Sequence, residues 1–80
     1  MSADLKGLVE AVARALADEP DAVRVRETER RGAVVFELSV APGDLGRVIG
    51  RQGRTAAALR TLLSSAAEAD GSRVTLDIRD

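Results

Sequence analysis

Hydrophobic residues recur at helical spacing at the start of the chain. Over residues 3–17 the apolar positions fall on one face of a helix: Leu5, Leu8, Val9, Val12 and Leu16. Ser2 is a candidate N-cap, with Asp4 in the first turn. The run Asp18-Glu19-Pro20-Asp21 ends this helix, because proline cannot continue it and disfavours helical geometry in Glu19.

Alternating positions predict three strands. The first sets Val23, Val25 and Thr28 against Arg24, Arg26 and Glu27, and a turn follows at residues 29–32. The second, residues 33–40, has one face of Val34, Phe36, Leu38 and Val40 and another of Val35, Glu37 and Ser39. The third, residues 73–79, turns Val74, Leu76 and Ile78 inward and Thr75, Asp77 and Arg79 outward.

Two further helices are predicted between the second and third strands. A short helix carries Leu45, Val48 and Ile49 at i, i+3, i+4 spacing, and a long one runs over residues 54–69. Asp70-Gly71 supplies a glycine stop to the long helix. The order is therefore α-β-β-α-α-β, an α+β fold in one domain that spans residues 1–80.

The two helices are joined by Gly50-Arg51-Gln52-Gly53. Glycine can take positive φ and turn main-chain N–H groups outward, and Arg51 adds a charge-assisted contact to phosphate oxygens. The N-terminus of the long helix contributes partial positive charge and unpaired donors at the same place. These features together predict a loop that receives a phosphate backbone.

Net charge is −1, yet the charges are unevenly distributed. Residues 44–63 carry Arg47, Arg51, Arg54 and Arg60 against Asp44 alone, a local +3, whereas the remainder sums to −4. Clusters of charged side chains often form only a solvated surface without a ligand, but this cluster coincides with the glycine loop. We interpret it as a focused site for a polyanion on an acidic body.

Composition excludes several classes of protein. The chain has no Cys and no His, so disulfides, thiolate metal sites and Ser-His-Asp or Cys-His catalysis are excluded. The glycines read G-x-x-x-G-x-x-G, and the only lysine is Lys6, which does not fit a nucleotide-binding loop. Neither a membrane span nor a signal segment is evident, so we expect a cytoplasmic, non-enzymatic protein that needs no metal or cofactor.

The run Val48-Ile49-Gly50-Arg51-Gln52-Gly53 between two helices resembles the core of a KH domain, a module that binds single-stranded nucleic acid. Both additional elements precede the shared β-α-α-β core, as in the type II form of this fold. The resemblance implies a three-stranded mixed sheet, with the first two strands antiparallel, the last parallel to the second, and all helices packed on one face.

At the level of the whole chain, Asp18-Glu19-Pro20-Asp21 and residues 40–54 are similar to the KhpA (YlqC-like) family of small bacterial RNA-binding proteins. This resemblance implies an RNA chaperone or regulator, linked to control of cell shape and division. It also implies a homodimer, or a heterodimer with a larger KH-containing partner of the KhpB (Jag-like) family.

The KH resemblance assigns RNA contacts to particular residues. The backbone clamp would be Gly50, Arg51, Gln52 and Gly53, flanked by Arg47 and Arg54. An adjacent apolar groove for about four bases would be lined by Ile49, Ala57 and Leu76, although Ile49 and Leu76 also fit a purely structural role in the core. Phe36 is the only aromatic residue, so stacking platforms are excluded and weak, permissive binding is expected. The alternative function is a dimerisation or recruitment module in which RNA contact is secondary.

Overall fold

The computed structural model describes residues 4–80. Its helices and strands follow the order expected from the sequence, with three short 3₁₀ segments between them: α1 (Leu5–Leu16), η1 (Pro20–Ala22), β1 (Arg24–Arg30), β2 (Ala33–Ser39), η2 (Pro42–Asp44), α2 (Leu45–Ile49), η3 (Arg51–Gly53), α3 (Arg54–Ala69) and β3 (Val74–Arg79).

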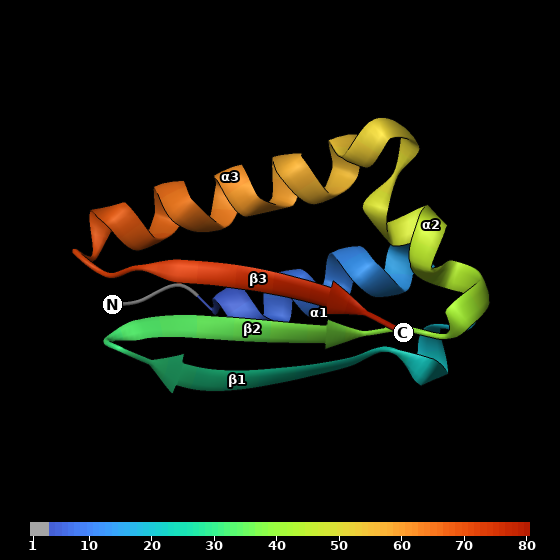
Figure 1. Ribbon diagram of the computed structural model, residues 1–80, viewed down its shortest axis with the longest axis horizontal. Coiled ribbons are helices and arrows are strands. Elements are labelled where there is room, and N and C mark those ends of the chain that lie inside the picture. The colour runs from blue at the N-terminus through green and yellow to red at the C-terminus, as the bar shows by residue number, and fades with distance from the viewer. Residues whose placement is uncertain (1–3) are drawn as a thin grey trace.

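The three strands form one mixed sheet in the order β1-β2-β3. β1 pairs antiparallel with β2 from Arg24↔Ser39 to Arg30↔Ala33, and β2 pairs parallel with β3 from Val34↔Val74 to Ser39↔Arg79. In Figure 1 the strands lie side by side, α3 is above the sheet and α1 is behind it. β2 is thus the central strand, and β3 forms one edge.

The hydrophobic core lies between one face of this sheet and the helices. Side chains from α1 and from all four elements of the β-α-α-β core (β2, α2, α3 and β3) meet there: Val9, Ala13, Phe36, Leu38, Val48, Leu59, Leu63 and Leu76. The predicted α+β fold with helices on one sheet face is confirmed. We call the opposite face of the sheet, turned away from α1 and α3, the outer face.

The first helix begins later than the pattern predicted. Asp4 is its N-cap, and the Asp4 carboxylate accepts a hydrogen bond of 2.9 Å from the Gly7 backbone N–H. A short acidic side chain at this position satisfies one of the unpaired donors of the first turn. The helix begins at Leu5, while Ser2 and Ala3, the predicted cap and start, both lie outside the described residues.

The first strand and its turn also differ from the prediction. The pairing of β1 with β2 has no bulge, so positions alternate strictly and Thr28 lies opposite Val35 on the outer face, while Glu27 shares the face of Val25. The strand continues through Arg30, and only Arg31 and Gly32, with φ of 55° and 80°, form the turn. Two residues with positive φ match the twist of a tight hairpin, which leaves residues 29 and 30 free to pair.

The long helix has the predicted bounds. At its end the Gly71 N–H donates to the Glu68 carbonyl and the Ser72 N–H to the Ala67 carbonyl. This pair of bonds is a Schellman cap, so the Asp70-Gly71 stop is confirmed. The cap fixes the point at which the chain turns into β3, and α3 consequently runs alongside that strand (Figure 1).

Candidate nucleic-acid interface

The loop between α2 and α3 has a backbone that its two glycines make possible. Gly50 has φ 80° and ψ 168°, a conformation nearly confined to glycine, and a Cβ there would collide with the Thr55 side chain. Gly53 has φ 72°, while Gln52 between them has φ 57°. Three left-handed residues within four positions fold the chain tightly back on itself, so its intervening side chains stand out from the surface.

The side chains on this loop are exposed and keep free hydrogen-bond donors. Arg51, Gln52 and Arg54 are all exposed. Nη2 of Arg54 donates to Oε1 of Gln52 at 3.2 Å, which orients the amide and leaves its NH₂ group outward. α3 begins at Arg54 without a side-chain cap, so its first turn offers main-chain donors beside the two guanidinium groups.

Arg47 flanks the loop but has other partners. Its Nη2 lies 3.1 Å from Oδ2 of Asp18, and its Nε lies 3.7 Å from Oδ1 of Asp44. Asp44 is only 2% exposed and accepts the backbone N–H groups of Asp18 and Glu19 at 3.0 and 2.9 Å. Arg47 and Asp44 therefore fasten the end of α1 to the start of α2, a role the sequence did not reveal.

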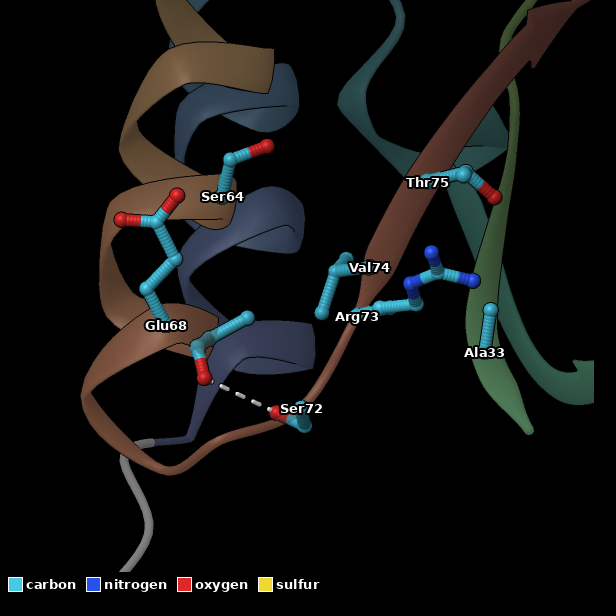
Figure 2. Close-up of a pocket in the computed structure, with 8 residues that line it drawn as sticks. Ala33, Ser64, Glu68, Ser72, Arg73, Val74 and Thr75 are labelled. Carbon is cyan, nitrogen blue, oxygen red and sulfur yellow. Dashed lines mark hydrogen bonds between the residues drawn. The ribbon is translucent and has the colours of Figure 1, made fainter.

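A groove runs along α3 and the edge strand β3. A hollow of about 220 Å³ is lined by Arg60, Leu63, Ser64, Val74, Thr75 and Leu76. It shares Ser64, Val74 and Thr75 with a second hollow of about 350 Å³, which extends to Ser72 and Ala33. Figure 2 shows Val74 pointing toward α3 in this groove, and Ser72 bonded to the Ala67 carbonyl at its end.

Arg60 lies across the narrower part of the groove. Its Nε and Nη2 donate to the Leu76 carbonyl at 3.3 and 3.2 Å. Because β3 is an edge strand, this carbonyl faces away from β2 and is free to accept a bond from a side chain or from a ligand. The groove thus contains both a main-chain acceptor and a guanidinium with unused donors.

The predicted lining residues are distributed unevenly. Leu76 lines the narrower hollow, although it is 4% exposed and belongs to the core cluster. Ile49 is half-buried and Ala57 is exposed, and the hollows along β3 include neither. Arg60 is a lining residue that was not predicted, although it follows Ala57 by three positions and helical spacing alone places the two on neighbouring positions of one face.

Neither a metal cluster nor a membrane-spanning helix is found among residues 4–80. Over residues 4–80, His, Cys, Asp and Glu form no group of three or more that could hold a metal ion. Within the same range, every helix is too short or too polar to cross a membrane.

A tight G-x-x-G loop between two helices, beside a mixed sheet whose last strand is parallel to the second, defines a KH domain of type II. The model of the family described as "KhpA/KhpB, KH domain" matches residues 6–78. This chain belongs to that family.

Relatives of similar length support the assignment. The chain is 53% identical over 76 residues to the RNA-binding protein KhpA of Halalkalibacterium halodurans, covering 95% of this chain and 100% of that protein. It is also 53% identical to KhpA of Aquifex aeolicus, over 92% of this chain and 94% of that one. KhpA of Caldanaerobacter subterraneus is 49% identical, over 89% and 95% of the two chains.

One solved structure has the same fold at low identity. It is the crystal structure of Era in complex with MgGDPNP and nucleotides 1506–1542 of 16S ribosomal RNA, with a TM-score of 0.62 and 20% identity. The similarity covers 94% of this chain but 29% of the Era chain. It supports the arrangement of helices and strands.

Proposed function

We propose that this chain is a non-catalytic protein that binds single-stranded RNA and acts as an RNA chaperone or post-transcriptional regulator. Gly50, Arg51, Gln52 and Gly53 clamp the sugar-phosphate backbone, and Arg54 extends the contact along the first turn of α3. The adjacent groove along α3 and β3 receives about four bases. The names of the KhpA relatives, which are RNA-binding proteins, support this proposal.

The observation that carries the proposal is the combination of backbone and charge at the loop. Positive φ at Gly50, Gln52 and Gly53 exposes the main chain, and Arg51 makes no ion pair in the described structure. Phosphate oxygens accept bonds from such a guanidinium and from the uncapped start of α3. A loop that served only to connect two helices would need neither feature.

Arg47 enters the proposal as a peripheral contact. Its guanidinium is shared by Asp18 and Asp44, so RNA competes with two carboxylates for it. Arg60, unlike Arg47, lies inside the groove. Two of its five N–H donors are bonded to the Leu76 carbonyl. We therefore expect Arg60 to be displaced by a base, or to contact one, and Leu76 to act through its carbonyl as well as its side chain. Ile49 and Ala57 would meet the RNA between this groove and the loop.

The test replaces Arg51 and Gln52 with Asp. Affinity for a labelled single-stranded RNA should fall by more than tenfold, because two carboxylates would face the phosphates, while the circular dichroism spectrum stays unchanged. Lys6→Glu combined with Ala11→Glu on exposed positions of α1 makes the same change in net charge and is the matched control. Equal losses in both variants, or none in the loop variant, would refute the proposal.

Two further properties distinguish this mode of binding. With about two to four phosphates neutralised, log K against log[salt] should have a slope of about −1.5 to −3. A perfect RNA duplex of equal length should compete poorly, because the groove accepts splayed bases. A duplex that competes as well as the single strand would exclude the groove.

We also propose that the protein works in pairs, with a second copy or with a KhpB-type KH protein. Leu62 on α3 is 56% exposed, and the neighbouring turn positions Ala58 and Ala66 are small, so another element can approach this helix closely. Light scattering over a concentration series should show a dimer, and an RNA with two spaced sites should bind far more tightly than one with a single site. A monomer at all concentrations would favour the heterologous partner.

A further inference from the structure

The outer face of the sheet carries a second group of arginines, remote in sequence from the loop. Strand register places their rows side by side: Arg24, Ser39 and Arg79 in one row, Arg26, Glu37 and Asp77 in the next, and Arg30 beside Ala33 at the far end. The arginines of these rows are exposed.

Positive charge dominates this face. Four arginines, Arg24, Arg26, Arg30 and Arg79, stand against the two carboxylates of Glu37 and Asp77. The acidic character of the rest of the chain, which the sequence suggested for everything outside residues 44–63, is therefore not uniform. Two basic surfaces exist, one at the loop and one on the outer face.

The guanidinium groups of the outer face differ in how far they are neutralised. Arg26 is paired with Glu37, with Nε and Nη2 at 2.8 and 2.7 Å from Oε1. Arg24 instead donates to the main-chain carbonyls of Asp21 and Val23 at 2.7 and 2.9 Å, so its side chain is oriented while its charge remains uncompensated. Arg79 makes no ion pair within the described range of the chain.

Arg24 and Arg79 frame a hollow. It has a volume of about 460 Å³ and is lined by Arg24, Val25, Arg26, Glu37, Ser39 and Arg79. The two arginines are two strands apart, which is roughly 10 Å between their main chains, with the Ser39 hydroxyl between them. Planar guanidinium forks on either side of a hydroxyl suit the oxygens of a phosphate group.

We propose that the outer face binds the phosphodiester backbone of RNA, at a segment other than the four nucleotides held by the loop and groove. This inference rests on the proposed function for its ligand but uses a separate surface. A protein partner fits this face less well, because the central apolar residue, Val35, is only 4% exposed and offers no anchor. Charge complementarity therefore selects an extended polyanion.

Binding at two surfaces has a measurable consequence. An RNA long enough to pass from the loop to the outer face, or two RNA strands held by the two surfaces, would gain affinity without any change in the groove. A short RNA that fills only the groove would gain nothing. Length dependence thus separates the outer face from the loop.

The experiment combines Arg24→Gln with Arg79→Gln and measures binding of a 6-nucleotide and a 20-nucleotide single-stranded RNA. The matched control, Lys6→Gln with Arg14→Gln, removes the same charge from α1. We expect unchanged affinity for the short RNA, about tenfold weaker binding of the long RNA at physiological salt, and a salt slope reduced by about 1.4, which corresponds to two phosphates. The control should change neither.

Each other outcome counts against the outer face. If long-RNA affinity and slope match those of the control, or if short and long RNA weaken equally, the outer face does not bind RNA. Tighter binding of polyglutamate than of RNA, lost in the Arg24→Gln/Arg79→Gln variant, would assign the face to an acidic protein instead. The Arg51→Asp/Gln52→Asp variant tests the loop separately. If this variant binds the short RNA as tightly as the unaltered protein, the loop is not an RNA-binding site. The outer face is then tested by the Arg24→Gln/Arg79→Gln variant alone.

Discussion

The two ends of α2 use arginine in opposite ways. Arg47, within α2, is held toward the start of the helix by Asp18 and by the buried N-cap residue Asp44, which itself accepts two backbone N–H groups just after α1. At the other end, Arg51 stands on a loop shaped by positive φ and has no acidic partner within 4 Å in the described structure. The two residues are four positions apart.

This contrast shows that partners, and not residue type or proximity to the loop, decide what an arginine does. The carboxylates at the start of α2 neutralise Arg47 and fix the helix against α1. Gly50 and the loop directly follow this fastened helix. The contacts that fasten the helix thus lie toward one end of α2, and the proposed RNA contacts lie at the other.

The largest effect is expected at the buried end, from Asp44→Ala. Two partly buried N–H groups would lose their acceptor, which should lower the free energy of unfolding by about 2–4 kcal/mol in urea titrations. A domain of this size has only about 4–12 kcal/mol in total. Asp70→Ala, at an exposed position, is the control and should change little. A loss below 0.5 kcal/mol for Asp44→Ala would mean that the buried end does not stabilise the fold.

The loop end should respond next, and unequally at its two glycines. Gly50→Ala adds strain at φ 80°, ψ 168° and a collision with Thr55, for a cost of about 2 kcal/mol or more. Gly53→Ala meets no atom within 4 Å, so only left-handed strain of about 1 kcal/mol applies. Thermal unfolding followed by circular dichroism measures both. Equal costs would show that the contact with Thr55 relaxes freely.

The direct comparison is between Arg47→Ala and Arg51→Ala. We expect Arg47→Ala to lower stability by about 1 kcal/mol and to leave the salt slope of RNA binding nearly unchanged. Arg51→Ala should leave stability within about 0.5 kcal/mol and reduce the slope by about 0.7, which corresponds to one phosphate on a single strand. If Arg51→Ala lowered the free energy of unfolding and Arg47→Ala reduced the salt slope, then Arg51 would be the structural residue and Arg47 the phosphate contact.

The smallest effect should come from Asp18→Ala. The Asp18 and Arg47 side chains are 71% and 55% exposed, so solvent screens their ion pair to a few tenths of a kcal/mol. The Asp18 main-chain N–H still bonds Asp44 after the change. A cost near that of Asp44→Ala in urea unfolding would show that the exposed pair, and not the buried carboxylate, fastens α1 to α2.

Local pattern was sufficient to predict most of the fold. The glycine loop and the Asp70-Gly71 stop predicted the bounds of α3, Arg54–Ala69, and every turn of that helix from Ala56 to Ala67 returns a buried residue to the same face. Alternation likewise gave the inward residues of β3. The prediction for Thr28 was wrong because it was grouped with Val23 and Val25. In a strand without a bulge, alternate residues face opposite sides of the sheet whatever their side chains are, so Thr28 lies on the other face from Val25.

Long-range pairing explains what the sequence could not predict. Asp44 bonds main-chain groups 26 and 25 residues away, and no spacing rule brings those segments together. The same limit applies to the outer face, where Arg24 and Arg79 belong to one row only because β2 pairs with both neighbouring strands. The loop itself was predictable, because its glycines, its charges and its helix are contiguous.

The position of Arg60 has a consequence for solubility. β3 forms an edge of the sheet, and an uncovered edge is a template on which a strand from another molecule can pair, which leads to aggregation. Arg60 occupies the Leu76 carbonyl on that edge and places a charge beside it. One side chain therefore occupies an outward-facing main-chain acceptor of the edge strand and adds a charge there, and both features disfavour pairing with a strand of another molecule.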